Sequence, residues 1–217
     1  MEFTPRRRLD LVSGRSHPEL AQEIAQHLGV DLGEANLREF ANGEIHCRFD
    51  SSIRGSDVFI VQTHCGPVND SLMEQLIMID AAKRASAKRI TAVCPYYGYS
   101  RQDRKATGRE PITAKLVADM LSVAGADRVV SVDLHSGQIQ GFFDIPTDNL
   151  QSAPLMAADI KQYYAKPSEL LIVSPDVGGV VRALAVASRL NADLAIVDKR
   201  RERAGESEVM NIGTPRY

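Results

Sequence analysis

Residues 101–105 read Arg-Gln-Asp-Arg-Lys and place three cations within five positions, directly after a tyrosine-rich stretch at 96–99. Arginine offers phosphate a planar fork of N–H donors, and lysine offers it a mobile positive charge. The segment could therefore close over a polyanion, or it could be an ordinary solvated basic loop. A second basic cluster near the end of the chain holds Lys199, Arg200, Arg201 and Arg203. Alone it is typical of a surface turn, but together the two clusters favour a shared phosphorylated ligand.

Acidic side chains stand where apolar stretches end. Asp133 and His135 are two residues apart, and strand alternation would place both on one face. Asp176 follows another apolar stretch. Carboxylates at strand ends beside basic loops suit Mg²⁺, which prefers oxygen ligands and usually keeps waters and substrate phosphates. The segment 176–179, Asp-Val-Gly-Gly, could present backbone N–H groups to an anion or form a tight strand-to-helix turn.

The elements that must position these residues alternate regularly from Asp57 onward. The expected strands are 58–61, 90–94, 129–132, 170–173 and 194–197, and the expected helices are 71–85, 113–123, 153–164 and 180–190. This alternation predicts an α/β fold with a parallel sheet and helices on both faces. Open α/β sheets bind ligands beyond the carboxyl ends of their strands, where both basic clusters are expected as loops.

The first block of the chain is mixed. We expect a strand at 9–14 and a helix at 18–28, which begins with Pro18 and is closed by Gly29. Strands at 36–40 and 44–49 should form a hairpin, because Asn-Gly at 42–43 is a strong turn signal. A break in the pattern near residue 150 predicts two domains, 1–150 and 151–217.

Composition excludes several classes of function. Lysine plus arginine (26) nearly balances aspartate plus glutamate (28), for a net charge of −2, so no nucleic-acid or membrane partner is expected. The three cysteines, Cys47, Cys65 and Cys94, form no Cys-x-x-Cys pair. No segment has the roughly 18 apolar residues of a membrane span. These features favour a cytoplasmic protein without a disulfide framework.

Five segments together resemble the ribose-phosphate pyrophosphokinases, also called phosphoribosyl pyrophosphate synthetases. They are Phe-Ala-Asn-Gly-Glu at 40–44, the tyrosine-rich and basic stretch 96–105, and the segments 133–144, 174–179 and 198–201. They stand in the family's order, and the resemblance runs from about Leu9 to Ile212.

The resemblance implies two phosphoribosyltransferase-like domains with mainly parallel sheets, the second incomplete. It also implies transfer of the diphosphoryl group of ATP to the 1-hydroxyl of ribose 5-phosphate, with Mg²⁺ as cofactor, giving phosphoribosyl pyrophosphate and AMP. A homo-oligomer, a hexamer in the family, is expected.

Site residues follow from the same resemblance, position by position. For ATP binding it implies Arg101, Gln102 and Asp103, together with Phe40, Asn42, Gly43 and Glu44 of a hairpin that a neighbouring subunit supplies to the adenine pocket. For the metal it implies Asp133, His135 and Asp176. Lys199 and Arg201 would be catalytic, and Arg201 would also bind ribose 5-phosphate.

One element of the family pattern does not occur in these 217 residues. The acidic loop of the type Asp-Asp-x-x-Asp-Thr-x-Gly-Thr, which in the family cradles the 5-phosphate, is absent from the sequence. A nucleotide-binding or regulatory subunit without catalysis is therefore the alternative to an enzyme. A stand-alone phosphoribosyltransferase is a weaker third hypothesis, since both basic clusters follow the diphosphokinase pattern.

Overall fold

The computed structural model describes residues 9–164, 166, 169–200 and 208–213, and only the backbone of residues 198–200 and 208–213. The chain divides into two compact units, Met1–Leu150 (unit 1) and Gln151–Tyr217 (unit 2). Among the helices of the described residues, none combines the length and the apolar character needed to cross a membrane.

Unit 1 is built on a six-stranded sheet in the order β2-β1-β5-β6-β7-β8, and every neighbouring pair is parallel. Its strands are β1 (Leu9–Ser13), β2 (Leu32–Gly33), β5 (Asp57–Val61), β6 (Arg89–Cys94), β7 (Arg128–Val132) and β8 (Thr147–Leu150). β2 pairs with one edge of β1, and β5 pairs with the other edge. The later strands β6, β7 and β8 follow in order beyond β5. The loops after β1 and β5 therefore diverge, as they do at the ligand crevices of doubly wound sheets.

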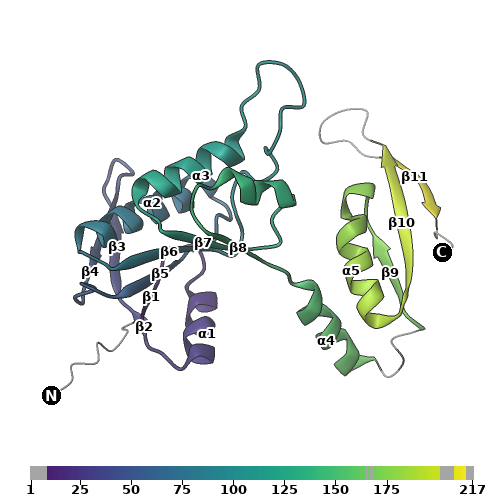
Figure 1. Ribbon diagram of the computed structural model, residues 1–217, viewed down its shortest axis with the longest axis horizontal. Coiled ribbons are helices and arrows are strands. Elements are labelled where there is room, and N and C mark those ends of the chain that lie inside the picture. Colours follow the sequence, from purple (N-terminus) through teal and green to yellow (C-terminus); the bar gives the residue numbers. More distant parts are fainter. Residues whose placement is uncertain (1–8, 165, 167–168, 201–207, 214–217) are drawn as a thin grey trace. The chain divides into compact units, whose positions relative to one another are not determined.

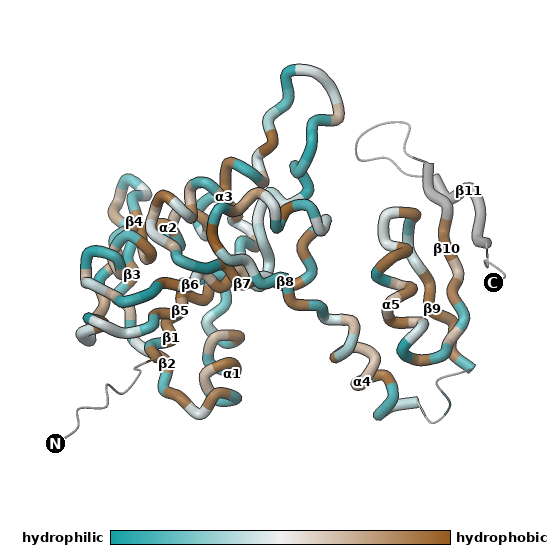
Figure 2. The backbone as a smooth tube through the Cα atoms, in the orientation of Figure 1, coloured by the Kyte–Doolittle hydropathy of each residue, from teal (hydrophilic) through white to brown (hydrophobic). Residues whose placement is uncertain are grey.

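Helices cover both faces of this sheet, as the sequence predicts. Figure 1 shows α1 (Pro18–Leu28) on one face and α2 (Val68–Arg84) and α3 (Thr113–Ala124) on the other. The strand period of two divides the buried side chains between the faces: Val12 packs into the core under α2 and α3, whereas Leu11 packs under α1. Figure 2 shows the backbone of β5 and β6 as largely hydrophobic, which is expected of strands buried on both faces.

The predicted hairpin is confirmed as β3 (Ala35–Glu39) and β4 (Ile45–Phe49), which pair antiparallel with Leu37 opposite Cys47. Apolar side chains of the hairpin pack against the α2 and α3 core. Gly43 at its tip has φ of +89°, and the Gly43 N–H donates to the Phe40 carbonyl at 2.9 Å. The tip is therefore a closed turn that projects from a packed base.

Unit 2 has a three-stranded sheet in the order β11-β10-β9. Its elements are α4 (Ala153–Tyr163), β9 (Leu171–Ser174), α5 (Val180–Leu190), β10 (Asp193–Arg200) and β11 (Glu208–Gly213). β9 and β10 are parallel, and β10 and β11 are antiparallel. Ala157, Val186 and Leu190 form the buried centre of its core, whereas Leu171 and Val173 on β9 are about half exposed, at 51% and 50%.

The predicted α/β class, with a mainly parallel sheet flanked by helices, is confirmed. The expectation that Lys199 and Arg200 follow a strand as a loop is wrong, because β10 runs through both residues. The reason is nonlocal: β11 pairs with β10 as far as Arg200 opposite Glu208, and this pairing satisfies the backbone of a stretch that is too basic to read as a strand.

Candidate functional site

The basic segment 101–105 lies beyond the carboxyl end of β6, on the edge of the sheet where the sequence predicts it. A cavity of about 390 Å³ opens there. Its lining consists of His64, Cys65, Gly66 and Val68 after β5 and of Tyr96, Tyr99, Ser100, Arg101 and Gln102 after β6. This volume falls in the range of pockets that hold small ligands. The structure thus brings two of the predicted nucleotide-binding residues, Arg101 and Gln102, to one pocket.

Gln102 joins the pocket to the start of α3. Its backbone N–H donates to the Tyr99 carbonyl at 2.9 Å, and its carbonyl accepts from the Ala114 N–H at 3.1 Å. The Thr113 hydroxyl donates to Gln102 Oε1 at 2.5 Å. Three bonds therefore fix the chain beside Arg101, and Arg101 itself is exposed at the rim.

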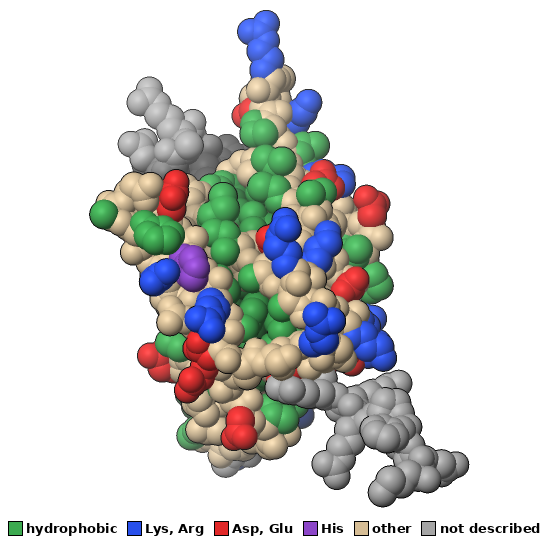
Figure 3. Space-filling view, turned by 90° about the vertical axis from the view of Figure 1, so that its left-hand side faces the viewer, with side chains coloured by type: hydrophobic (Ala, Val, Ile, Leu, Met, Phe, Trp, Pro, Cys, Tyr) green, Lys and Arg blue, Asp and Glu red, His purple; other side chains and the backbone are tan. Residues whose placement is uncertain are grey.

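Beyond Gln102 the loop projects from the sheet and carries its charge outward. Arg104, Lys105 and Arg109 are all exposed, and Figure 3 shows basic side chains at the tip of the projection. Glu110 closes the loop by accepting hydrogen bonds from the Thr107 N–H at 2.9 Å, the Thr107 hydroxyl at 2.8 Å and the Ala106 N–H at 2.7 Å. The bonds from Thr107 and Ala106 lower the pKa of the Glu110 carboxyl. The exposed cations of the loop are thus available to an anion, whereas the Glu110 carboxylate is hydrogen-bonded within the loop.

Asp103 ties the basic loop to a second predicted motif. Its side chain is buried, at 8% exposure. Asp103 Oδ2 accepts from the Ser136 hydroxyl at 2.5 Å and from Gln138 Nε2 at 3.0 Å. In this arrangement the carboxylate holds two loops together, residues 101–105 and the loop of 133–144.

Asp133 and His135 lie on the same edge, beyond the carboxyl end of β7. The expectation that strand alternation places both on one face is wrong, because β7 ends at Val132 and Asp133 takes a left-handed φ of +46°. The Asp133 N–H donates to the Leu150 carbonyl at 2.9 Å, which holds the turn against the end of β8. His135 is exposed.

The predicted metal ligands do not form a cage made of protein alone. In the part of the chain that the structure describes, no three His, Cys, Asp or Glu side chains are placed to hold a metal ion together. Asp133 and His135 belong to unit 1, and Asp176 belongs to unit 2. Mg²⁺ is commonly held by one or two carboxylates, with waters and substrate phosphates completing its shell. Of the predicted donors of unit 1, the Asp133 carboxylate is of the kind that Mg²⁺ takes in such sites.

For segment 176–179 the structure supports the alternative of a tight turn. Asp176 caps the short turn Val177–Gly179: its Oδ1 accepts from the Gly179 N–H at 2.8 Å. The Ser174 hydroxyl donates to the Asp176 carbonyl at 2.7 Å. A Cβ at Gly179 would stand 2.9 Å from the Ser174 hydroxyl oxygen, so the turn is closely packed. The Gly179 N–H is therefore taken by the Asp176 carboxylate.

Of the two predicted catalytic cations, the structure describes the backbone of one, Lys199. The backbone of Lys199 pairs with Val209 in the β10 and β11 ladder, next to a register shift between Asp198 and Lys199. Arg201 lies outside the described residues.

Among the hairpin residues, Phe40 is 47% exposed at the tip. The Arg38 guanidinium lies 5.5 Å from the centre of the Phe40 ring, and the His46 ring meets that ring edge-on at 6.0 Å. Asn42 Oδ1 accepts from the Glu44 N–H at 3.2 Å. No residue of the hairpin lines the Arg101 pocket. The chain therefore presents Phe40, Asn42, Gly43 and Glu44 at the hairpin tip and outside its own Arg101 pocket.

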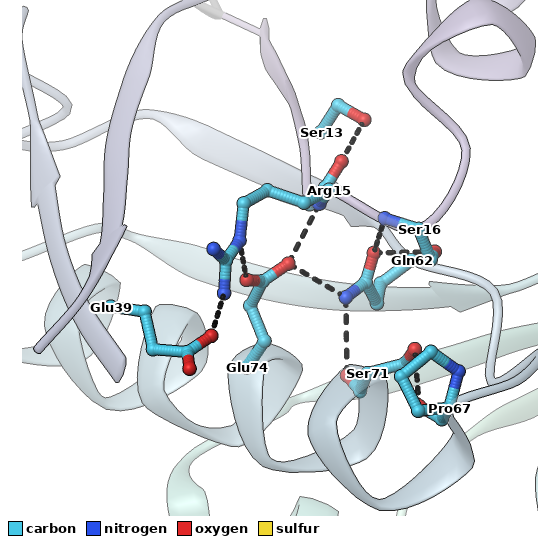
Figure 4. Close-up of polar contacts among 9 residues, drawn as sticks. Ser13, Arg15, Ser16, Glu39, Gln62, Pro67, Ser71 and Glu74 are labelled. Carbon is cyan, nitrogen blue, oxygen red and sulfur yellow. Dashed lines mark hydrogen bonds and ion pairs between the residues drawn. The ribbon is translucent and has the colours of Figure 1, made fainter. Parts of the chain in front are cut away.

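A buried polar network that the sequence analysis missed supports the same sheet edge. Glu74 of α2 is 2% exposed and accepts from the Arg15 N–H at 2.7 Å, from Arg15 Nε at 2.5 Å and from Gln62 Nε2 at 2.9 Å (Figure 4). Gln62 Oε1 in turn accepts from the Ser16 hydroxyl at 2.7 Å. A Cβ at Gly14 would stand 2.2 Å from Gln62 Oε1, so a larger residue there would have to displace the Gln62 amide. The network fixes the loops after β1 and β5, where the strand order reverses.

His64 was also missed, although it stands in a polar run, Gln-Thr-His-Cys at 62–65, directly after a buried strand. This is the signal that identified the other candidate residues. His64 belongs to the wall of the Arg101 pocket, its side chain is fully buried, and desolvation lowers its pKa to about 4.

Comparisons with known proteins agree with the motifs. Residues 9–125 match the N-terminal domain of ribose phosphate pyrophosphokinase. The chain is 60% identical over 204 residues to a ribose-phosphate pyrophosphokinase of Mesorhizobium japonicum, which covers 94% of this chain and 66% of that protein. A ribose-phosphate pyrophosphokinase of Caulobacter vibrioides is 60% identical over 205 residues with the same coverage.

A solved structure agrees as well. The phosphoribosylpyrophosphate synthetase from Mycobacterium smegmatis matches with a TM-score of 0.85 at 51% identity, over 94% of this chain and 67% of that one. The chain thus spans about 66% of the length of the curated relatives. From the match of residues 9–125, more than half of its length, and from these identities, the chain belongs to the ribose-phosphate pyrophosphokinase family.

Proposed function

We propose that this chain binds Mg–ATP at the Arg101 pocket and is a ribose-phosphate diphosphokinase. The reaction transfers the diphosphoryl group of ATP to the 1-hydroxyl of ribose 5-phosphate. The hydroxyl oxygen attacks the β-phosphorus, the bond to the oxygen that bridges the α- and β-phosphorus breaks, and AMP leaves with that oxygen. The hydroxyl proton is released, and phosphoribosyl pyrophosphate is formed.

The observation that carries this proposal is the convergence of the loops at the Arg101 pocket. Arg101 and Gln102 bound a cavity at the carboxyl edge of a parallel sheet, and Asp103 ties their loop to the motif at 133–144. Transfer of a phosphoryl-type group requires alignment and charge neutralisation from the protein, without a covalent nucleophile. The Arg101 guanidinium at the rim and the exposed cations on the projecting loop suit that task.

For the charged part of the nucleotide we propose three groups of residues. Arg101 and Gln102 bind ATP directly, and Asp103 holds their loop in place. Mg²⁺, when bound with the nucleotide, would neutralise phosphate charge, and Asp133, His135 and Asp176 are its proposed protein contacts. Lys199 and Arg201 are the proposed cations for the transferring group, and Arg201 also for ribose 5-phosphate.

The adenine pocket is proposed to be completed by a neighbouring copy of the chain. Phe40, Asn42, Gly43 and Glu44 sit at an exposed hairpin tip and contribute nothing to the Arg101 pocket of their own chain. A homo-oligomer, hexameric as in the family resemblance, would bring them to the pocket of another subunit. We propose a cytoplasmic protein that acts on ATP and ribose 5-phosphate.

The test uses the purified 217-residue chain and the variant Arg101→Ala. Losing a charge-assisted hydrogen bond to phosphate should weaken Mg–ATP binding roughly 10- to 100-fold by isothermal titration calorimetry. Lys88→Ala is the matched control, because Lys88 is an exposed cation that precedes β6 at the opposite edge of the sheet. Equal affinity of Arg101→Ala and wild type would contradict the proposed site.

A second assay addresses the reaction itself. AMP formation that depends on both Mg²⁺ and ribose 5-phosphate supports the diphosphokinase, whereas ATP binding without AMP formation supports the nucleotide-binding subunit.

A further inference from the structure

At the inner wall of the Arg101 pocket, three side chains from three parts of the chain form a buried polar cluster. His64 follows β5, Gln75 lies on α2 and Cys94 ends β6, and all three are fully buried. His64 Nε2 lies 2.8 Å from Gln75 Oε1, and His64 Nδ1 lies 3.0 Å from the backbone nitrogen of Gly98. The ring thus stands between the helix and the segment that leads to Arg101.

These contacts determine the protonation state of the ring. Because the Gly98 N–H can only donate, Nδ1 must be unprotonated, and Nε2 carries the proton that Gln75 Oε1 accepts. The orientation of the Gln75 amide is fixed independently. Gln75 Nε2 lies 3.3 Å from the Ile60 carbonyl and 3.4 Å from the Val93 carbonyl, so it must be the donor end. A neutral imidazole in a single tautomer satisfies all these groups, and its burial favours the same neutral form.

The cluster reaches the nucleotide-binding loop at a closely packed point. A Cβ at Gly98 would stand 2.8 Å from His64 Cβ and 3.0 Å from Val68 Cγ2, so the backbone of the loop rests on the histidine. Tyr97, directly before Gly98, anchors the loop on its other side by donating its hydroxyl to the Ala114 carbonyl at 3.0 Å.

The backbone that follows needs such support. Tyr99 takes a left-handed φ of +60°, which a bulky side chain adopts only where its surroundings enforce it. Arg101 follows two residues later. A loop released at Gly98 would be free to relax at Tyr99 and to move Arg101 and Gln102 away from the pocket.

We propose that His64 is a positioning residue for nucleotide binding. Its neutral ring, supported from behind by Gln75, holds Gly98 and thereby sets the position of Arg101 and Gln102. The effect on ATP affinity rests on the proposed function, whereas the effect on the loop does not.

The test compares two variants that each remove one half of the contact. In His64→Asn the side-chain oxygen can take the place of Nδ1 and still accept from the Gly98 N–H, while the bond to Gln75 is lost. In His64→Gln the longer side chain can reach Gln75 but offers no acceptor to Gly98. Each variant loses one buried hydrogen bond, and His64→Asn also loses more packing volume than His64→Gln, so a purely structural role predicts that His64→Asn is perturbed at least as much as His64→Gln.

Two measurements are made on the purified 217-residue chain. Mg–ATP affinity by calorimetry should stay within about threefold of wild type in His64→Asn and fall about tenfold in His64→Gln, as expected for losing one positioning hydrogen bond. Amide hydrogen exchange of residues 96–101 in the absence of nucleotide should be faster in His64→Gln than in His64→Asn.

The outcomes separate the two proposals. If wild type fails to bind Mg–ATP, the proposed function fails, and the exchange comparison alone still tests the positioning role. Equal exchange in the two variants, or faster exchange in His64→Asn, would overturn the inference.

If either variant does not fold, the wild-type chain provides the test. ¹⁵N NMR at pH 7 should show an unprotonated Nδ1 coupled across the hydrogen bond to the Gly98 nitrogen. A protonated Nδ1, or the absence of this coupling, would overturn the inference as well.

Discussion

Lowering the pH from 7 to 5 should weaken the folding of unit 1 through His64, and the variant His64→Asn should lack this effect. An unfolded chain protonates its histidines near their ordinary pKa of about 6.5, whereas burial lowers the pKa of His64 to about 4. Between these two values the unfolded state binds a proton that the folded state does not bind. Stability therefore falls as the pH falls, and this contribution is absent above pH 6.5.

The linkage relation gives the size of the effect. With a pKa of about 4 in the folded state, the free energy of unfolding loses about 2 kcal/mol at pH 5 and about 3 kcal/mol once the pH reaches 4. The other four histidines of the chain are shared by wild type and variant, so their contributions cancel in the difference.

The assay is urea unfolding with pulsed hydrogen exchange, read on peptides from β5 and β6 so that only unit 1 is followed. We expect wild type to exceed His64→Asn in stability at pH 7, and the difference to shrink by about 2 kcal/mol at pH 5. A difference that stays constant between pH 7 and pH 5 would show that His64 titrates normally in the folded chain. The burial argument for its neutral state would then be refuted.

Four further predictions concern the same sheet edge. Glu74→Leu removes the acceptor of three hydrogen bonds and should lower the free energy of unfolding by roughly 3 kcal/mol in urea titrations, because three donors from Arg15 and Gln62 lose a partner and one of these bonds is buried; a loss below about 1 kcal/mol would contradict this. Gly14→Ala places a Cβ within 2.2 Å of Gln62 Oε1 and should cost roughly 2 kcal/mol in the same titration, whereas an unchanged midpoint would show that Gln62 moves freely. Asp103→Ala should speed amide exchange in residues 133–144 at least several-fold, and unchanged exchange would mean that the two loops are held independently. Lys199→Ala should lower turnover by roughly a hundredfold or more while Mg–ATP affinity stays nearly the same, because we propose that its charge acts on the transition state; an equal loss of affinity and turnover would contradict that role.

Local signals predicted the elements whose ends are set by their own residues. The helix that begins at Pro18 and ends before Gly29 has the predicted bounds, since proline and glycine fix backbone conformation at a helix start and stop. The Asn-Gly turn of the hairpin is equally local. The start of α2 lies at Val68 instead of 71, because its first turn carries polar residues that read as part of a loop.

Elements that depend on a distant partner could not be read from the sequence. β8 consists of Thr-Asp-Asn-Leu and is a strand only because β7 pairs with it along one edge. The extension of β10 through Lys199 depends on β11 in the same way. Both gain their hydrogen bonds from distant segments of the chain, and no local pattern shows which segments will pair.

The site was predictable in its position and less so in its contacts. Residues after strands identified the carboxyl edge, and the family resemblance supplied the roles proposed for Arg101 and Gln102. The partners of Asp103 are 33 and 35 residues away in the chain, and Gln75 reaches His64 only through the packing of α2 on the sheet. Such pairs depend on tertiary structure, which a single sequence does not display.

The unequal cores of the two units bear on how the chain loses its structure. The core of unit 1 runs continuously from β1 to the loop of 133–144, whereas among the described residues of unit 2 it centres on Ala157, Val186 and Leu190. Stability depends on buried contacts, so we expect the two units to differ in their resistance to heating. Unit 2 should melt first and expose apolar strands while unit 1 still holds the sheet edge that carries the Arg101 pocket. Cellular quality control would then sense unit 2, and its unfolding would remove the groups that we propose it contributes to the reaction while the Arg101 pocket is still folded.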